Sequence, residues 1–270
     1  MQFGNVMEWL AVLAALIVGV PFAAWLAQDR LIFFPQPIVS TAHLPMDAKA
    51  LEVVASDGTR LRGWLRSASR SPAPAVLYFG GNAEEVSWSV ADKRWPRDWA
   101  IVALNYRGYG ASEGKAGEAA LVADAFAIYD AIATRPDIDH GRIVAFGRSL
   151  GTGIAVKLAA QRPLAGVILV SPYDSLVAIG RMHYPWLPVS SLLKHRFDVI
   201  EDASRIRAPM LAIVAERDPI IPPARSRALF DAWAGPKRWE AMPDADHDTV
   251  GESEAFWQRV ARFLAEAGWR

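Results

Sequence analysis

The strongest constraint on the fold of this chain is a regular alternation of short apolar runs with helical patterns, which begins near residue 50. The expected strands are residues 51–56, 60–65, 75–79, 100–105, 143–147, 167–171, 210–215 and 238–242. The expected helices are residues 84–94, 118–135, 152–161, 222–233 and 252–267. Almost fully apolar strands that alternate with helices predict an α/β protein with a mostly parallel central sheet of about eight strands and helices on both faces.

Two intervals depart from this alternation. The first two expected strands flank Asp57-Gly58, a dipeptide typical of a tight hairpin turn, so we expect the sheet to begin with an antiparallel pair. Residues 173–208 are too many for a simple crossover helix and are rich in aromatic and aliphatic side chains. We interpret them as a small helical cap over the strand ends. Two ordinary helices joined by a proline-containing loop are the alternative.

The segment Gly147-Arg148-Ser149-Leu150-Gly151 directly follows one expected strand and precedes an expected helix. A strand that breaks into Gly-x-Ser-x-Gly and then a helix presents the serine hydroxyl on a sharp turn, where neighbouring side chains have no room. The pattern predicts that Ser149 is a nucleophile in acyl transfer. Arg148, inside this segment, either contacts the substrate or forms a structural ion pair, and the sequence favours neither.

A serine hydroxyl needs a base that takes its proton and a carboxylate that orients the base. Of the five histidines, His247 alone lies in a loop after the last expected strand, so it is the expected base. Asp218 follows the strand 210–215 and is the expected acid. Asp174, which follows the preceding strand, is the competing acid. Its alternative role is to cap the helix that begins after Pro172.

Acyl transfer also requires N–H donors that stabilise the tetrahedral oxyanion. One expected donor is the backbone N–H of Leu150, at the positive end of the helix after Ser149. The second is the backbone N–H of Asn82, in the Gly-Gly-Asn turn after the strand 75–79. The same turn can also lead into a helix whose first turn carries Glu84 and Glu85, and the two interpretations are compatible.

The segment 105–110 is also rich in glycine, which raises the question of a phosphate site. It lacks the third glycine of a dinucleotide fingerprint, and no Gly-Lys-Ser/Thr follows. We therefore interpret it as a structural turn in which Arg107 pairs with an acid.

The N-terminal region is strongly apolar. Residues 9–27 carry no charge and span about 28 Å as a helix, close to the hydrocarbon thickness of a bilayer. Trp9 and Trp25 lie near the two ends, where aromatic rings favour the membrane interface. We expect residues 1–30 to form a single-pass membrane anchor, 31–49 a linker and 50–270 the catalytic domain. The side of the membrane stays open.

A cleaved signal peptide and a buried core helix are the alternatives for this N-terminal region. The absence of Lys and Arg before Arg30 weakens the first, and the absence of a polar stripe weakens the second. Elsewhere the composition excludes several classes. The net charge is zero, so no nucleic-acid partner is expected, and the lack of cysteine excludes disulfides, thiolate zinc sites and cysteine nucleophiles.

These motifs resemble those of the α/β-hydrolase superfamily over residues 50–268. The matching parts are the turn 80–82, the segments 105–112, 147–151 and 171–175, the Asp218 loop and the His247 loop. The chain is most similar to membrane-tethered serine hydrolases with an N-terminal helix and a Phe-Pro-containing linker. That group is related to protein depalmitoylases, dienelactone hydrolases and prolyl oligopeptidase-type peptidases. The resemblance implies a Ser149–Asp218–His247 triad and hydrolysis without cofactor or metal, although Gly80 stands where many lipases have a histidine.

We therefore expect a membrane-anchored serine hydrolase that cleaves carboxylic ester or thioester bonds through an acyl-enzyme. Its expected partners are a small-molecule or acyl ester substrate and the lipid bilayer. The expected substrate contacts are Gly81, Tyr173, Tyr184 and Trp186. A serine peptidase or amidase with the same triad, and a non-catalytic membrane-tethered binding protein, are the alternatives.

Overall fold

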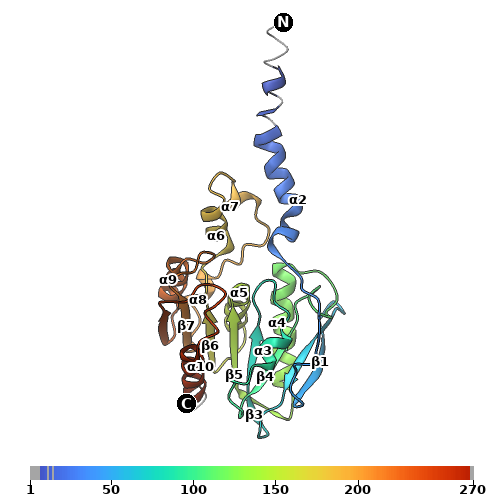
Figure 1. Cartoon of the computed structure of the whole chain (residues 1–270), viewed down its shortest axis with the longest axis vertical. Coiled ribbons are helices and arrows are strands. Elements are labelled where there is room, and N and C mark those ends of the chain that lie inside the picture. The colour runs from blue at the N-terminus through green and yellow to red at the C-terminus, as the bar shows by residue number, and fades with distance from the viewer. Residues whose placement is uncertain (1–6, 11, 14, 268–270) are drawn as a thin grey trace.

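The computed structural model describes residues 7–10, 12–13 and 15–267, with residues 15 and 16 described by their backbone alone. A single eight-stranded sheet with the order β1-β2-β4-β3-β5-β6-β7-β8 forms the centre of the molecule (Figure 1). Its strands are β1 (Ala48–Val54), β2 (Arg60–Arg66), β3 (Ala73–Phe79), β4 (Ala100–Leu104), β5 (Ile138–Arg148), β6 (Gly166–Val170), β7 (Met210–Ala215) and β8 (Lys237–Met242). The prediction of a mostly parallel sheet of about eight strands is confirmed.

The first two strands are antiparallel, as the hairpin signal predicts. β1 pairs with β2, and β2 continues antiparallel onto β4, whereas every other neighbouring pair is parallel. Gly58 adopts a φ of 84° in the turn between them, a conformation that costs glycine little. The parallel strands therefore all end at one edge of the sheet.

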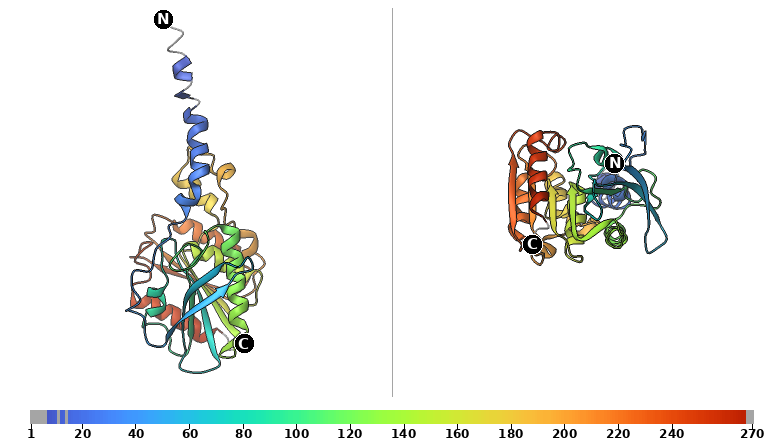
Figure 2. Two further views of the ribbon diagram at one scale, coloured as in Figure 1. Left: turned by 90° about the vertical axis from the view of Figure 1, so that its right-hand side faces the viewer. Right: turned by 90° about the horizontal axis from the view of Figure 1, so that it is seen from below.

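Helices cover both faces of the sheet (Figure 2). The longer helices are α4 (Glu118–Ala133), α5 (Leu150–Ala159), α9 (Pro223–Ala232) and α10 (Glu254–Glu266), and α3 (Ser87–Ala91) is short. One apolar core lies between the sheet and α4, α5 and α9, and a second lies between the sheet and α3 and α10.

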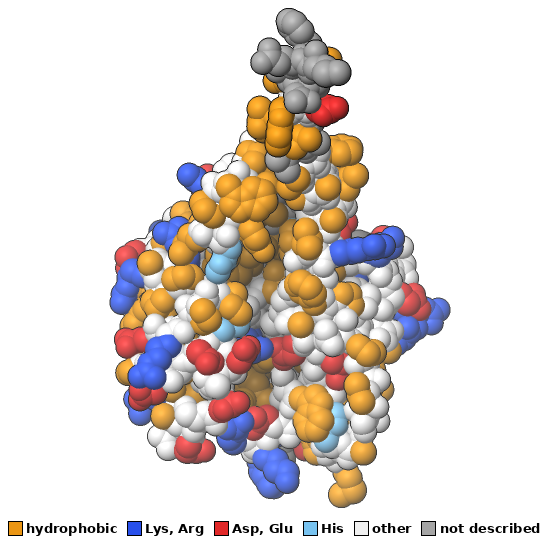
Figure 3. Space-filling view, turned by 45° about the horizontal axis from the view of Figure 1, so that its top comes forward, with side chains coloured by type: hydrophobic (Ala, Val, Ile, Leu, Met, Phe, Trp, Pro, Cys, Tyr) orange, Lys and Arg blue, Asp and Glu red, His pale blue; other side chains and the backbone are white. Residues whose placement is uncertain are grey.

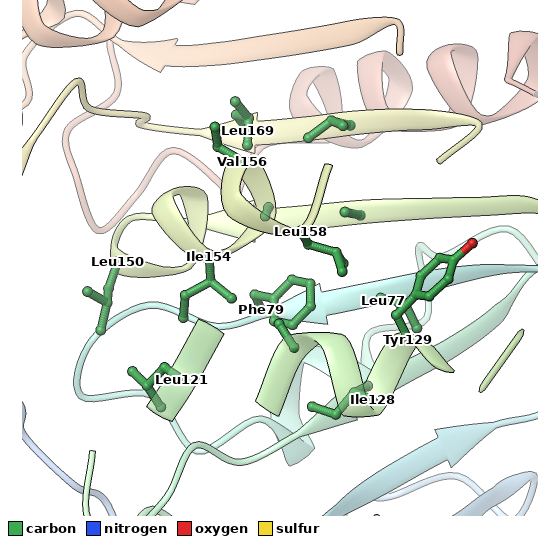
Figure 4. Close-up of a cluster of buried hydrophobic side chains, with 14 of the residues drawn as sticks. Leu77, Phe79, Leu121, Ile128, Tyr129, Leu150, Ile154, Val156, Leu158 and Leu169 are labelled. Atoms are coloured by element: carbon green, nitrogen blue, oxygen red, sulfur yellow. The ribbon is translucent and has the colours of Figure 1, made fainter. Parts of the chain in front are cut away.

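Strand β3 illustrates why these apolar runs become central strands. Leu77 and Phe79 belong to the core between the sheet and helices α4 and α5 (Figure 4). Val76 and Tyr78 belong to the core on the opposite face of the sheet. Successive side chains of a strand point to opposite faces, so a strand buried on both faces must be apolar throughout. Each fully buried Leu or Val of this kind contributes about 1.5–3 kcal/mol of transfer free energy.

The expected helix over residues 84–94 is much shorter than predicted. It spans only α3, because the Glu84 carboxylate accepts hydrogen bonds from the Gly81 N–H, the Tyr78 hydroxyl and the Ser89 hydroxyl and so holds its own residue in a loop. Asp92 then ends the helix in an extended conformation.

The interval between β6 and β7 contains three short helices, α6 (Leu176–His183), α7 (Val189–Leu192) and α8 (Ile200–Ala203). Figure 1 shows α6 and α7 at one end of the molecule, beside the N-terminal helix. The suggestion that Asp174 caps the first of these helices is wrong by one residue, because Ser175 accepts the N–H of Ala178. The exact limits of a cap at 173–208 stay a prediction.

The N-terminal region contains a π-helical turn, η1 (Ala15–Gly19), and α2 (Val20–Ile32). Within the residues described, none of the helices is both long and apolar enough to cross a bilayer. The prediction of an anchor over residues 1–30 is thus not confirmed, and positions 1–6, 11 and 14 lie outside the described residues.

Candidate active site

The turn after β5 holds Ser149 in a strained conformation. Its φ of 50° and ψ of −117° are rare for a residue with a side chain, and α5 begins immediately afterwards at Leu150. The flanking glycines are required by space: a Cβ on Gly147 would lie 2.5 Å from the Gly151 carbonyl oxygen, and one on Gly151 would lie 2.1 Å from the Phe79 carbonyl oxygen. The Ser149 hydroxyl is therefore presented at the carboxyl edge of the sheet by a turn that only glycine can flank.

The three expected catalytic side chains lie in one hydrogen-bonded chain. His247 Nε2 is 2.9 Å from Ser149 Oγ, and His247 Nδ1 is 2.7 Å from Asp218 Oδ2. All three residues are buried, and His247 and Asp218 arrive from the loops after β8 and β7. A hydrogen bond from Nδ1–H to a carboxylate leaves Nε2 as the acceptor for the serine proton.

The Asp218 carboxylate is held by several donors. Oδ1 accepts the N–H groups of Ile220 and Ile221 at 2.9 and 2.8 Å, and Oδ2 meets the imidazole. Burial by itself raises the pKa of a carboxyl, but the hydrogen bonds from His247 and from the Ile221 N–H outweigh it, so the pKa of Asp218 lies below its ordinary value. The group is thus an anion that can orient and stabilise an imidazolium.

The turn after β3 lies next to the serine because β3 and β5 are neighbours, with Phe79 paired to Gly147. A Cβ on Gly81 would lie 3.7 Å from the Ser149 Cβ, which places this turn against the nucleophile. Gly81 donates its N–H to Glu84 at 2.6 Å, whereas the Asn82 N–H has no acceptor among the described residues. Within the described part of the chain, the Asn82 N–H is thus free of protein acceptors in the turn beside the serine, and the roles of Asn82 and Leu150 as oxyanion donors stay a prediction.

Glu84 and Arg148 form a polar junction next to the site, and the sequence analysis did not identify Glu84 as the partner of Arg148. Arg148 Nη1 lies 3.4 Å from Glu84 Oε2, and Nη2 lies 3.3 Å from the His247 carbonyl oxygen. Arg148 thus forms a structural ion pair with Glu84. Through its two contacts it joins the turn after β3 to the loop that carries His247. The usable signal was the spacing of Gly81 and Glu84, since a carboxylate three residues after a turn commonly bonds back to a backbone N–H.

The competing acid is occupied elsewhere. Asp174 Oδ2 accepts Arg225 Nη1 at 2.8 Å, and Oδ1 accepts the Ser175 N–H at 3.0 Å. Three of the other histidines have partners other than the serine: His43 bonds to Ser87, His183 to the Ile220 carbonyl, and His195 to Asp29.

The expected substrate contacts have different outcomes. Tyr173 is wrong as a substrate contact, because it is completely buried and its ring packs under Gly153 of α5. Its aromatic character reflects the core rather than a binding surface. Tyr184 and Trp186 are exposed between α6 and α7, at 53% and 67%, and Gly81 lies beside the serine. Their contact with a substrate stays a prediction.

Arg107 has the structural role that the sequence predicts. It forms a two-pronged ion pair with Asp124, with contacts of 2.7 and 2.6 Å, and a further pair with Asp57 at 2.6 Å. Both ionic bonds hold the loop after β4 and raise the pKa of Arg107 above its ordinary value.

Comparisons with known proteins agree with this architecture. The family model Hydrolase_4, described as "Serine aminopeptidase, S33", matches residues 71–178. The uncharacterized protein Rv2307c of Mycobacterium tuberculosis is 36% identical over 264 residues, which cover 95% of this chain and 94% of that protein. The alpha/beta hydrolase domain-containing protein WAV2 of Arabidopsis thaliana is 25% identical over 268 residues, with 88% and 87% covered.

Solved structures share the fold at lower identity. The esterase Pf2001 of Pyrococcus furiosus superposes with a TM-score of 0.67 over 87% of this chain and 99% of its own, at 21% identity. The relatives match almost the full length of the chain, and the sheet order and the strand–turn–helix that carries Ser149 agree with them. We conclude that this chain belongs to the α/β-hydrolase family.

Proposed function

We propose that this protein is a serine hydrolase that cleaves carboxylic esters or thioesters. The observation that carries the proposal is the buried chain of hydrogen bonds from Ser149 through His247 to Asp218. Such a chain makes a hydroxyl into a nucleophile, because the imidazole takes the proton as the oxygen attacks and the carboxylate stabilises the imidazolium.

The reaction proceeds in two halves. Ser149 Oγ bonds to the acyl carbon while its proton moves to His247 Nε2, and the carbonyl electrons move onto an oxyanion. The N–H groups of Asn82 and Leu150 stabilise that oxyanion, and each such donor contributes about 3–4 kcal/mol to lowering the barrier. The oxyanion collapses, the alcohol or thiol leaves with the proton from His247, and water repeats the sequence to release the acid.

The decisive experiment uses a fluorophosphonate probe on the purified full chain. Wild type should be labelled and hydrolyse p-nitrophenyl esters, whereas Ser149→Ala should lose labelling and about 10⁵-fold or more in kcat. Ser226→Ala is the matched control, because Ser226 is also a buried serine but donates its hydroxyl to the Pro172 carbonyl. Unlabelled, folded wild type would favour the non-catalytic alternative.

The choice between an ester and an amide substrate is tested on matched substrates. The family description names an aminopeptidase, and Pf2001 is named an esterase, so the substrates tested include both ester and amide bonds. We expect kcat/KM for an acyl ester to exceed that for the corresponding anilide. The reverse order would assign the protein to the peptidases.

We further propose that the N-terminal segment attaches the protein to a bilayer and that the acyl group is apolar. Support comes from exposed apolar side chains on α2, among them Phe22 and Leu26, and on the adjacent cap, where Tyr184 and Trp186 are exposed. Figure 3 shows hydrophobic side chains gathered over this end of the molecule. The activity on p-nitrophenyl esters should then rise with acyl length, and a flat series would contradict an apolar acyl pocket.

Attachment itself is measured by flotation with phosphatidylcholine vesicles. The full chain should float with the vesicles, and the double variant Phe22→Ser/Leu26→Ser should float less. Val39→Ser/Met46→Ser is the matched control, because these two side chains are even more exposed but lie in the linker. Equal flotation of all three proteins, or none, would contradict attachment through α2.

A further inference from the structure

The turn that carries Asn82 is bonded to a segment far away in the sequence. The Asn82 amide nitrogen donates to the Ile32 carbonyl, and its Oδ1 accepts the Phe34 N–H at 3.1 Å. Ile32 is the last residue of α2, so the chain that leaves the N-terminal helix lies against the turn next to Ser149.

Tyr109 completes this contact from a third part of the chain. Its hydroxyl accepts the Phe34 N–H at 2.9 Å and donates to Asn82 Oδ1 at 2.7 Å. Tyr109 is completely buried, and burial raises its pKa to about 12, so the hydroxyl keeps the proton that it donates. A single oxygen thus ties the linker backbone to the Asn82 side chain.

The segment that makes these contacts is itself firmly held. The Phe33 side chain is buried, and the Gln36 carbonyl accepts the Gly110 N–H at 2.7 Å. On the other side, the buried Gln28 of α2 donates to the Leu192 carbonyl at 3.2 Å and accepts the Lys194 N–H at 2.7 Å. The segment is therefore fixed between the cap and the body, where Figure 1 shows α2 meeting the domain.

We propose that residues Ile32–Phe34, Asn82 and Tyr109 form a brace that positions the oxyanion donor of the Asn82 backbone, so that the N-terminal segment is part of the catalytic apparatus. The proposal rests on the serine hydrolase function proposed above. Asn82 acts here through its side chain, whereas its N–H acts on the substrate, and Tyr109 is a positioning residue that touches neither substrate nor reacting atoms.

The physical reason is the sensitivity of oxyanion stabilisation to geometry. A donor works only when it lies about 2.7–3.1 Å from the developing oxyanion, and a displacement of about 1 Å costs up to about 100-fold in rate. Ala83, the next residue, has a φ of 57°, so the turn is held in a conformation that a free loop rarely adopts. The brace supplies the contacts that keep it there.

The test is Tyr109→Phe in the full chain, with Tyr129→Phe as the matched control. Tyr129 is also buried, and its hydroxyl is also hydrogen-bonded, because it donates to the Pro163 carbonyl at 2.8 Å. Unlike Tyr109, it lies in α4 and makes no bond to the turn 80–83. We expect Tyr109→Phe to lower kcat and the rate of fluorophosphonate labelling by the same factor, about tenfold, with KM within about twofold. The control should keep both rates.

A double-mutant cycle and hydrogen exchange separate positioning from general destabilisation. Asn82→Ala keeps the backbone donor but removes the brace, so Tyr109→Phe should have almost no additional effect on kcat in that background. Amide exchange in the peptide that contains residues 80–84 should become faster in Tyr109→Phe and not in Tyr129→Phe.

The outcomes distinguish the two proposals. Wild type that is neither labelled nor active would overturn the proposed function, and with it the catalytic role of the brace. Labelled wild type with unchanged kcat and unchanged exchange in Tyr109→Phe would overturn the brace alone. Additive losses in the cycle, or an equal loss in Tyr129→Phe, would also overturn it.

Discussion

The two sides of Ser149 are held in different ways. On one side, His247 and Asp218 come from loops after neighbouring strands and bond directly to each other and to the serine. On the other side, the turn 80–83 is held by Glu84, by Tyr106, whose hydroxyl donates to the Gly80 carbonyl at 2.7 Å, and by the segment after α2. The base side is therefore nearly self-contained, and the turn side depends on distant parts of the chain.

This difference predicts that single substitutions are most damaging on the base side. Asp218→Asn should lower kcat/KM by about 10⁴-fold, because the amide no longer fixes the tautomer that accepts the serine proton. Asp174→Asn is the control, since its carboxylate pairs with Arg225 instead, and it should keep most of the activity. Steady-state kinetics on one ester decides, and a larger loss in Asp174→Asn would exchange the roles of the two acids.

A substitution at the joint between the two sides should affect the fold itself. In Gly151→Ala the new Cβ would lie 2.1 Å from the Phe79 carbonyl oxygen, so β3 and α5 must move apart at a cost of about 3 kcal/mol. Gly251→Ala is the comparison, because nothing lies within 4 Å of that position. Urea unfolding measures both, and equal midpoints would show that the close approach is not rigid.

On the turn side, a single polar change should have a graded effect. Glu84→Gln keeps the shape but weakens the charge-assisted bonds to Gly81 and Arg148, so kcat should fall about tenfold while KM changes little. Glu85→Gln is the matched control, because that carboxylate bonds to Ser87 and Asn105 instead. A loss as large as that of Asp218→Asn would abolish the contrast between the two sides.

The smallest expected effect concerns stability against acid. The pKa of Asp218 is depressed in the folded protein, so its contribution to stability is fully present above the pKa of an unfolded Asp, about 3.9. It is lost as the pH falls through the lower folded value. The melting temperatures of wild type and Asp218→Asn should therefore differ most near neutral pH and converge below about pH 4. A gap that widens on acidification would contradict the depressed pKa.

The same contrast explains what the sequence could predict. Ser149 and Asp218 follow apolar strands, and His247 follows the more polar last strand, β8. Because parallel strands end at one edge of the sheet, the order and spacing of these residues predicted a common site. β5 begins at Ile138, earlier than expected. The prediction missed this start because residues 139–142 are not apolar, and Ile138 joins the sheet through its pairing with Ala73 of β3. The apolar pattern within a segment thus predicted the strands and the residues at their ends.

Contacts between distant segments were not predictable in this way. Nothing local marks Tyr109 or Phe34 as partners of Asn82, since they lie 27 and 48 positions away. Tyr173 was assigned to substrate because aromatic content alone does not distinguish a side chain inside the core from one on a surface. The N-terminal apolar run likewise indicated an anchor without revealing that Gln28 is buried against the cap.

The close packing of the glycines around Ser149 has a consequence for how such an enzyme acquires new substrates. A methyl group at Gly81, Gly147 or Gly151 would require a shift in the backbone or in Arg148. These three positions next to the nucleophile can therefore hardly be substituted. If acyl preference varies among such enzymes, we expect the changes in the segment between β6 and β7, where Tyr184 and Trp186 are exposed in the loop between α6 and α7.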